Sequence, residues 1–280
     1  MSTLPGSAPD AAAAPSMRER YGRWALVTGA SSGIGRAMAH GLAARGLSVV
    51  LVSDQPAELE AVAAELITRH GVAARACAVD LARPDVLDVL RESTRDIEIS
   101  VLVNNASFGV IGPFLAKPLA DYDTLLAVNA RAYIALTHAY LPAIVAANRG
   151  ALIFVTSLNA LAPIGGSAVY TASKALEVSF AGALWYELRE TDVDVLIVLP
   201  GPTRTGFQKK AGTMLAPWAM EPEEVAEGAL EVLGKELTFI PGEKNRSLAR
   251  MAGELPFEQR IIAASQALHT ALVQGLDPEK

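Results

Sequence analysis

The sequence has a single cysteine, Cys77, among its 280 residues. One cysteine cannot form an intramolecular disulfide, and it excludes a metal site built from several cysteines. Cys77 lies in the apolar run from Ala73 to Val79, so we expect a buried and unreactive thiol. The four histidines, at positions 40, 70, 138 and 269, lack the spacing of metal ligands. We therefore predict no metal site.

The sequence also lacks a run of about 18 apolar residues, the length that a membrane-spanning helix requires. Its start, rich in Ala, Pro and Ser, has neither the basic nor the apolar region of a secretory signal, and we expect a disordered tail and a cytoplasmic location. No stretch rich in Lys and Arg is present, and the formal net charge is −6. Nucleic acid is therefore disfavoured as a partner.

The chain is instead rich in aliphatic residues: 51% of its residues are hydrophobic but only 6% are aromatic. A core built mainly from Ala, Val, Leu and Ile suits buried parallel strands and the helices that cover them. From Arg23 onward, apolar runs typical of strands alternate with helical patterns, which is the signature of βαβ units. The predicted fold class is α/β, a single-domain Rossmann-type doubly wound parallel sheet of about seven strands flanked by helices.

We place the strands at residues 24–28, 48–53, 73–79, 99–104, 150–157, 193–199 and 237–240. The helices are predicted near 33–46, 56–70, 84–96, 118–147, 168–190, 222–234 and 246–275. Within the helix near 118–147, the polar Asn129 and the helix-breaking Pro142 predict an interruption or distortion.

A glycine-rich turn, Thr-Gly-Ala-Ser-Ser-Gly-Ile-Gly, joins the first predicted strand to the first predicted helix. Its glycines allow a tight turn, a close approach of the backbone to a pyrophosphate and close packing of the helix. The helix N-terminus adds free N–H groups that attract an anion. The spacing departs from the Gly-x-Gly-x-x-Gly fingerprint, but strand, turn and helix together predict a dinucleotide site. It would be formed by Gly29, Ser31, Ser32, Gly33, Ile34 and Gly35.

Tyr170 and Lys174 are spaced by one helical turn, and Ser157 ends an apolar run upstream of them. A phenol with an ordinary pKa of about 10 is a poor acid or base near neutral pH. Because Lys174 shares a helix face with Tyr170, its charge is expected to lower the pKa of Tyr170. Ser157 could then hydrogen-bond a substrate oxygen. An isolated Tyr-x-x-x-Lys would be only a surface pair, but with the glycine turn it predicts a proton-transfer site.

These motifs together resemble the short-chain dehydrogenase/reductase family. The similar elements, in the family's order and spacing, are the glycine turn, Asn104-Asn105-Ala106, Asn129, Ser157 and Tyr170-x-x-x-Lys174. The resemblance runs from about Arg23 to the end of the chain. It is closest to reductases of the hydroxysteroid and 3-ketoacyl type, judged from Ile240-Pro241-Gly242, Asn245-Arg246 and Leu255-Pro256. It implies an oxidoreductase that uses NAD or NADP.

The end of the second predicted strand bears on the choice of cofactor, because the adenosine ribose lies there in a doubly wound fold. The Asp54 carboxylate can accept hydrogen bonds from the ribose hydroxyls of NAD, and it would repel the 2′-phosphate of NADP. The similar reductases usually have Arg where Asp54 stands, and the family's NAD-type Asp stands one position earlier, at Ser53. NAD is the favoured cofactor, and NADP bound with the help of Arg36 is the alternative.

The resemblance implies further contacts with the cofactor. Asp80 and Leu81 would frame the adenine, and Asn105 would line the adenosine half. The segment after the sixth strand resembles the family's Pro-Gly-x-x-x-Thr, in which Thr205 is the candidate for the nicotinamide carboxamide. The residues of this segment assigned to the cofactor are Pro200, Gly201, Thr203 and Thr205, and Tyr170 and Lys174 would lie at the nicotinamide ribose.

The implied mechanism delivers a hydride from the cofactor to a carbonyl carbon. Tyr170 donates a proton to the carbonyl oxygen while Ser157 hydrogen-bonds that oxygen, and oxidation of the alcohol reverses these steps. Asn129 would place a water that connects Lys174 to solvent, although a helix Asn can equally serve packing.

Largely apolar segments, 158–169, 108–114 and 205–220, are expected to shape the substrate pocket, because such pockets are mostly hydrophobic. The candidate lining residues are Phe108, Phe114, Phe207, Met214, Leu215, Trp218 and Met220. They predict a hydrophobic alcohol or ketone, steroid-like or with an acyl chain. The alternatives are a non-catalytic NAD(P)-binding regulator or scaffold, and an enzyme acting on a sugar or an imine. The intact Ser157, Tyr170 and Lys174 argue against the regulator.

The predicted organisation is a disordered tail over 1–20 and one nucleotide-binding catalytic domain over 21–280. The domain includes a substrate loop at 201–221 and a C-terminal helical segment at 244–275, which could contact a membrane surface or a partner. In the family, long helices at positions like 118–147 and 168–190 pair between subunits. The resemblance therefore implies a homodimer or homotetramer.

Overall fold

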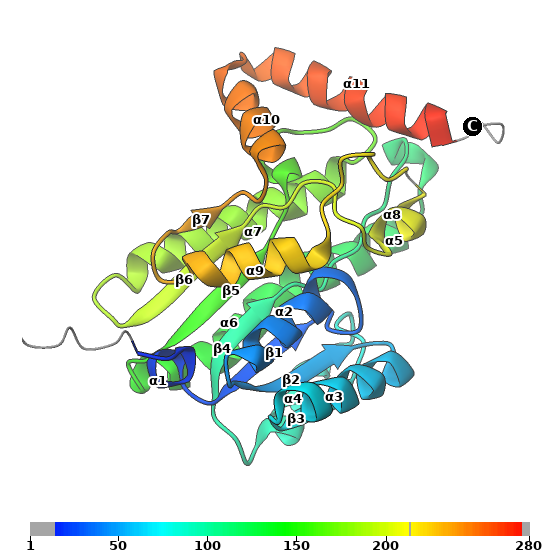
Figure 1. Cartoon of the computed structure of the whole chain (residues 1–280). Helices are drawn as coiled ribbons and strands as arrows, with labels where there is room; N and C mark the ends of the chain where they lie inside the picture. Colours follow the sequence, from blue (N-terminus) through cyan, green and yellow to red (C-terminus); the bar gives the residue numbers. More distant parts are fainter. Residues whose placement is uncertain (1–14, 213, 276–280) are drawn as a thin grey trace, which may run out of the picture.

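The computed structural model describes residues 15–212 and 214–275. A single sheet of seven parallel strands, in the order β3-β2-β1-β4-β5-β6-β7, lies at its centre (Figure 1). The strands are β1 (Trp24–Thr28), β2 (Ser48–Ser53), β3 (Ala74–Ala78), β4 (Ile99–Asn104), β5 (Gly150–Val155), β6 (Val193–Val198) and β7 (Thr238–Phe239). The predicted doubly wound α/β sheet is confirmed, and each strand lies where the sequence placed it.

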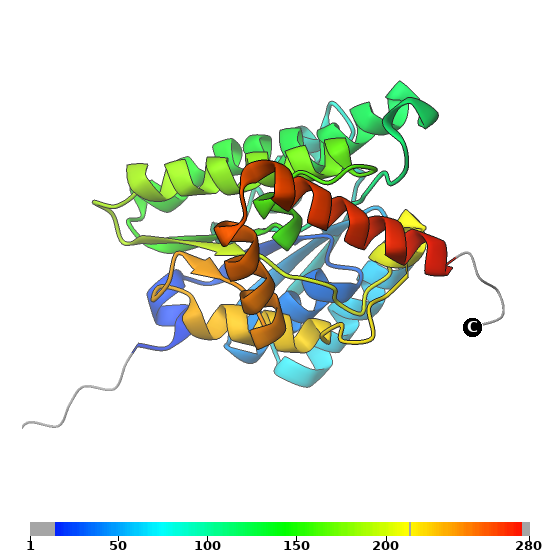
Figure 2. The same ribbon diagram turned by 90° about the horizontal axis from the view of Figure 1, so that it is seen from above.

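Helices cover both faces of the sheet (Figure 2). They are α1 (Met17–Tyr21), α2 (Gly33–Ala44), α3 (Pro56–His70), α4 (Val86–Thr94), α5 (Leu119–Leu126), α6 (Ala132–Ala146), α7 (Ala168–Glu187), α8 (Phe207–Ala211), α9 (Pro222–Val232), α10 (Glu243–Glu254) and α11 (Phe257–Gly275). Short helical segments are η1 (Phe114–Ala116), η2 (Ala127–Arg131) and η3 (Leu158–Leu161). Within the described part of the chain, no helix has the length and apolar character needed to cross a membrane.

The sheet divides the core into two layers, because successive residues of a strand point to opposite faces. In β1, Ala25 and Val27 pack with the layer that contains α2, α3 and α9. Trp24 and Leu26 pack with the other layer, which contains α4, α6 and α7. All five residues of β1 are buried. The strand therefore reads as a continuous apolar run, as expected of a parallel strand covered on both faces.

The predicted tail over 1–20 is wrong for residues 17–20, which belong to α1. Ser16 and Glu19 form a capping box that starts this helix. The hydroxyl of the buried Tyr21 then donates to Asp194 at 2.7 Å, and Arg20 pairs with the same carboxylate at 2.8 Å. These contacts hold the start of the chain against β6. Residues 1–14 lie outside the described residues.

Two predicted helices are interrupted. The first is interrupted at Asn129, which lies in the π-helical segment η2 between α5 and α6, as predicted. Pro142 is contained within α6 without ending it. The predicted helix over 246–275 is instead two helices, α10 and α11, because Pro256 forces Leu255 into an extended conformation.

The strand order places β1 between β2 and β4, so the chain leaves β1 toward one edge of the sheet and later returns to its other side. At such a point the loops after neighbouring strands diverge to opposite faces and leave a crevice at the carboxyl ends of the strands. Most residues predicted to bind the cofactor follow β1, β2, β3, β4 and β6, and Tyr170 and Lys174 lie on α7, the helix after β5. The fold therefore brings them to one edge of the sheet.

Candidate functional site

One cavity of about 980 Å³ occupies this edge of the sheet. Of the predicted site residues, those that line it are Gly29, Ser31, Ser32, Gly33, Ile34, Asp54, Asp80, Leu81, Asn105, Ser157, Tyr170, Lys174, Pro200, Gly201, Thr203 and Thr205. Gly35 and Asn129 lie behind the lining. The residues that the sequence predicted as parts of one site therefore line a single cavity in the structure.

The glycine turn forms the floor of the cavity, and its backbone conformation and close contacts leave no room for side chains at the glycine positions. Gly29 has a φ of +66°, which L-residues with a Cβ rarely adopt. A Cβ on Gly35 would lie 2.3 Å from the carbonyl oxygen of Gly29, and one on Gly33 would lie 2.8 Å from a methyl carbon of Thr205. The backbone at the start of α2 is thus left accessible to a ligand, and its free N–H groups favour an anion.

Hydrogen bonds fix this turn against the neighbouring strands. Asn105 donates to the carbonyl oxygen of Thr28 at 2.8 Å, and its own backbone N–H donates to the Thr28 hydroxyl. The hydroxyls of Ser31 and Ser53 lie 2.9 Å apart and link the turn to the end of β2. The role of Asn105 visible here is therefore to position the turn, in addition to lining the cavity.

The part of the cavity beyond β2, which is expected to hold the adenosine ribose, has a carboxylate at its rim and no arginine among the described lining residues. Asp54 is exposed there, just beyond β2. Arg36, the residue that would favour NADP, lies outside the lining and pairs with Glu65 at 2.6 Å. Asp80 accepts a hydrogen bond from the backbone of Ala82 at 2.8 Å, which fixes the turn after β3.

These residues fit a dinucleotide. The glycine turn forms a cradle that any Cβ would fill, and Thr205 closes over it from the loop after β6. Ser107 lines the same cavity with a buried hydroxyl that has no hydrogen-bond partner among the described residues. When bound, a nicotinamide dinucleotide would supply or accept the hydride at this edge of the sheet.

Tyr170, Ser157 and Lys174 meet at the part of the cavity that is expected to hold the nicotinamide. Tyr170 is buried, and its ring packs against Phe207 with centroids 5.4 Å apart. Ser157 lies two residues after β5 and caps η3, where its hydroxyl accepts a hydrogen bond from the backbone of Asn159 at 3.1 Å. The Lys174 ammonium lies 5.8 Å from the centroid of the Tyr170 ring. Ser157 and Tyr170 can therefore hydrogen-bond one substrate oxygen, and Lys174 lies behind the Tyr170 ring.

A third ionisable residue, Glu177, joins Tyr170 and Lys174, and the sequence motifs did not predict it. The Lys174 ammonium donates to both of its carboxylate oxygens at 3.0 Å, and both side chains are almost fully buried. Burial raises the pKa of Glu177 to about 7, and the charge of Lys174 limits that rise. Burial lowers the pKa of Lys174, and Glu177 opposes this change. The visible signal was a glutamate three residues after a lysine on the inward face of a helix.

The predicted lowering of the Tyr170 pKa by Lys174 is wrong for this structure. Burial and then the negative charge of Glu177 raise the pKa of Tyr170 well above its ordinary value, while a hydrogen bond with Ser157 opposes the rise. The main physical reason is the burial of the phenol, and the negative charge of Glu177 beside Lys174 adds to the rise.

Asn129 is fully buried, and its amide holds the loop after β4 against α7. It accepts from the backbone N–H of Phe108 at 3.2 Å, donates to the carbonyl oxygen of Phe108 at 3.0 Å and donates to Ser173 at 3.2 Å. Its side chain thus reaches the site through Ser173, which precedes Lys174. The water that Asn129 was expected to place stays a prediction.

The substrate end of the cavity is mostly apolar and is covered by α10 and α11. Of the predicted lining residues, Phe108, Phe207, Met214 and Trp218 line it. Phe114 does not, because its ring stacks on Tyr122 with centroids 5.2 Å apart. Leu215 and Met220 are also outside the lining.

Helices α10 and α11 also line the cavity, which the sequence did not predict. These helices and Leu255 between them add Leu248, Ala249, Met251, Ala252, Leu255, Arg260, Ala263, Ala264, Ala267 and Leu268 to the lining. Arg260 donates to the carbonyl oxygens of Leu161 and Leu255 and so connects the start of α11 to η3 and α10. The repeat of small apolar residues along α11, three or four positions apart, was the available signal.

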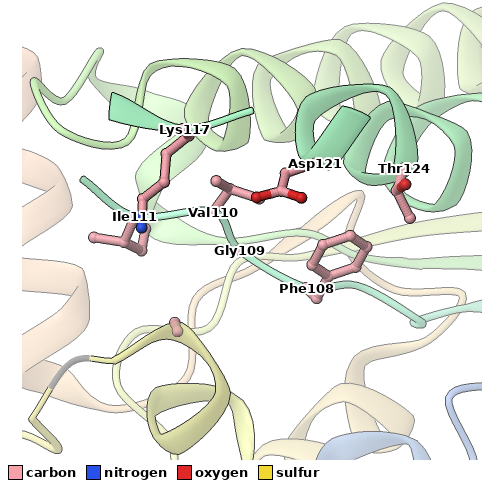
Figure 3. Close-up of a pocket in the computed structure, with 8 residues that line it drawn as sticks. Phe108, Gly109, Val110, Ile111, Lys117, Asp121 and Thr124 are labelled. Carbon is pink, nitrogen blue, oxygen red and sulfur yellow. The ribbon is translucent and has the colours of Figure 1, made fainter. Parts of the chain in front are cut away.

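A side pocket of about 320 Å³ lies next to this cavity and shares Phe108, Ile111 and Thr124 with it. Figure 3 shows the loop after β4 on one side of this pocket and Asp121 and Thr124 from α5 on the other. It extends the substrate end of the site along α5.

The chain is similar to known proteins over most of its length. Residues 23–216 match the model of the short chain dehydrogenase family. The chain is 34% identical over 232 residues to the 7beta-hydroxysteroid dehydrogenase of Clostridium sardiniense, a match that covers 82% of this chain and 89% of that protein. It is 32% identical over 230 residues to the inactive hydroxysteroid dehydrogenase-like protein 1 of Mus musculus, covering 79% of this chain and 68% of that protein.

Solved structures of short-chain dehydrogenases also share the fold of this chain. A 7beta-hydroxysteroid dehydrogenase structure superimposes with a TM-score of 0.83 at 26% identity, covering 89% of this chain and 99% of that one. A short-chain dehydrogenase from Sphingobium yanoikuyae in complex with NADPH gives a TM-score of 0.77 at 30% identity, covering 92% of this chain and 97% of that one.

Proposed function

Because the chain belongs to the short-chain dehydrogenase family, we propose that it transfers a hydride between a nicotinamide cofactor and the carbonyl carbon of a hydrophobic ketone, or the reverse from the alcohol. The observation that carries this proposal is the joint position of Ser157, Tyr170, Lys174 and the glycine turn on one cavity. A proton relay and a dinucleotide cradle in one space are what such a reaction requires.

In the proposed mechanism, Ser157 and Tyr170 both hydrogen-bond the substrate oxygen and orient the carbonyl. During reduction, Tyr170 donates its proton to this oxygen, and during oxidation the phenolate accepts the proton of the alcohol. Lys174 would hold the nicotinamide ribose of a bound cofactor, and Thr205 would hold its carboxamide. The cover formed by α10 and α11 limits the access of water to the reacting carbon.

We propose NAD(H) as the preferred cofactor. Asp54 lines the adenosine end, where a carboxylate accepts hydrogen bonds from ribose hydroxyls and repels a 2′-phosphate. The ion pair with Glu65 holds Arg36 away from this place. The similar Sphingobium enzyme binds NADPH, so NADP(H) is the alternative that the cofactor measurement in the Discussion decides.

We propose a steroid-like ketone or alcohol as the substrate class, and an acyl-chain ketone as the second candidate. Apolar side chains from the loop after β4, the loop after β6 and both C-terminal helices surround the substrate end. Such a lining favours a large, rigid apolar molecule with few polar groups. The named activity of the similar Clostridium protein points the same way.

The function is tested by the oxidation of NADH or NADPH in the presence of a 7-oxosteroid, a long-chain 3-oxoacyl thioester or a ketose sugar. We expect cofactor oxidation with the 7-oxosteroid and no cofactor oxidation with the ketose. Binding of cofactor with no turnover on any of these ketones would instead favour the non-catalytic regulator, which the inactive mouse relative makes a real alternative.

We propose a homodimer or homotetramer formed through α5, α6 and α7. Large apolar side chains are exposed on these helices: Leu126, Ile134, Val145, Leu176, Trp185 and Tyr186. Because exposed apolar surface of this kind marks interaction sites, we expect sedimentation of the purified protein to give twice or four times the chain mass of 29.4 kDa. A single species at the chain mass would refute it. The predicted cytoplasmic location stays a proposal.

A further inference from the structure

The ion pair between Lys174 and Glu177 places a carboxylate directly behind the proposed proton-transfer residues. Of the three N–H donors of the ammonium, two are engaged by Glu177 at 3.0 Å, and a weaker contact at 3.5 Å goes to the carbonyl oxygen of Val155. Side-chain exposure is 1% for Lys174 and 0% for Glu177. Water therefore screens neither the pair nor its effect on Tyr170.

Among the described residues, Lys174 is the only charged group that acts on the pKa of Glu177, so no second cation balances its charge there. Besides Lys174, the titratable groups that the charge of Glu177 affects are Tyr170 on α7 and Tyr133 on α6. The packed elements η2 and β5 contribute neutral groups: the Asn129 amide bound to Ser173, and the Val155 carbonyl bound to the Tyr133 hydroxyl.

The Lys174–Glu177 ion pair beside the phenol therefore carries no net charge. An ammonium alone about 6 Å from the Tyr170 ring would stabilise the phenolate strongly in a buried site. With the carboxylate bonded to that ammonium, the net charge of the pair is zero. The phenolate loses most of this stabilisation, and the neutral phenol is favoured.

We propose that Glu177 is a positioning residue that keeps the proton on Tyr170 by neutralising Lys174, and so sets this site for carbonyl reduction. The inference rests on the proposed function and adds the favoured direction. In reduction the transferred hydride would leave a C–H bond of the reduced nicotinamide, which becomes oxidised, and form a new C–H bond at the carbonyl carbon. The π electron pair of the carbonyl moves to its oxygen, the O–H bond of Tyr170 breaks, and its proton forms the hydroxyl of the product. The phenolate then regains a proton from solvent. A site held in the phenol form is ready for this step, whereas alcohol oxidation needs the phenolate first.

The test compares wild type with Glu177→Gln, in which an amide of similar shape replaces the carboxylate. The rate of alcohol oxidation is measured against pH, with a 7-hydroxysteroid as the first substrate. Because Lys174 is no longer neutralised, the pH midpoint of oxidation is expected to fall by about one to two units. A midpoint that is unchanged or higher would overturn the proposal. A role of Glu177 in stability alone would change the yield or melting temperature without moving the midpoint.

Glu187→Gln is the matched control, because Glu187 is an exposed glutamate on the same helix. It is expected to keep the wild-type midpoint. If Glu177→Gln does not fold, Glu177→Asp is used instead. It keeps the negative charge, but its side chain is shorter by one methylene, so the carboxylate lies further from Lys174. Its midpoint is expected to fall by a smaller amount, and an unchanged midpoint would count against the proposal.

A substrate-free measurement separates this inference from the proposed function. The ultraviolet absorbance of tyrosinate is titrated for each protein and for its Tyr170→Phe counterpart, and the difference isolates Tyr170 from the other five of the six tyrosines. The titration midpoint of Tyr170 is expected to be lower with Glu177→Gln. A lower midpoint without turnover on any ketone would refute the proposed function alone. Turnover with equal midpoints would refute only the role of Glu177.

Discussion

Tyr170→Phe is expected to lower the turnover number by about 10²- to 10⁴-fold, the usual contribution of a general acid or base. The phenol is the proposed proton donor, and phenylalanine keeps its ring but has no proton to give. The ring should still pack against Phe207, because that contact is between carbon atoms of the two rings. Folding and cofactor binding should therefore be unaffected, and steady-state rates and cofactor titration measure the two effects separately.

Tyr186→Phe provides the control for the same chemical change on the same helix. Tyr186 is 60% exposed and lies under the guanidinium of Arg189, outside the lining of the cavity. Its variant should keep the wild-type rate. Near-normal turnover of Tyr170→Phe would remove Tyr170 from the mechanism, whatever the binding data show.

Wild-type protein is expected to bind NADH at least about tenfold more tightly than NADPH. The cause is repulsion between the Asp54 carboxylate and the 2′-phosphate, which is worth about 1 kcal/mol in water at close range and more near a protein surface. Fluorescence titration can measure both affinities, because Trp218 lines the cavity. Tighter binding of NADPH would contradict the assignment of Asp54.

Two variants identify the residue responsible. Asp54→Asn removes the charge with little change of shape and should bring the two affinities close together, mainly by improving NADPH binding. Glu65→Gln releases Arg36 from its ion pair without changing the cavity lining. It should leave the preference for NADH in place. A strong gain in NADPH binding in this variant would show that Arg36 reads the phosphate.

The fold was predictable because its strands are buried on both faces and so appear as unbroken apolar runs. The residues at which the helices begin and end were harder to predict from the sequence. Short α1 depends on the capping box of Ser16 and Glu19 and on the distant Asp194, which local sequence does not reveal. Leu255 and Pro256 were noticed, yet the helix was extended across them, although the residue before a proline rarely stays helical.

The site was predictable where a motif places several residues at fixed spacing, as in the glycine turn and Tyr170-x-x-x-Lys174. Glu177 was not, because its effect depends on burial, and the same Lys-x-x-Glu spacing on an exposed face would be a weak surface pair. The cover formed by α10 and α11 depends on how these helices fold back over the cavity. That arrangement is set by long-range packing.

The most direct test of the account is isotope transfer. Wild-type protein is incubated with a 7-oxosteroid and a reduced nicotinamide cofactor deuterated at its transferable position, and the product alcohol is analysed by mass spectrometry. Hydride transfer predicts one deuterium at the carbinol carbon for each cofactor oxidised. With Tyr170→Phe, deuterated alcohol should form only at the residual turnover rate of this variant. Cofactor oxidation without deuterium in the alcohol would contradict direct hydride transfer in this cavity.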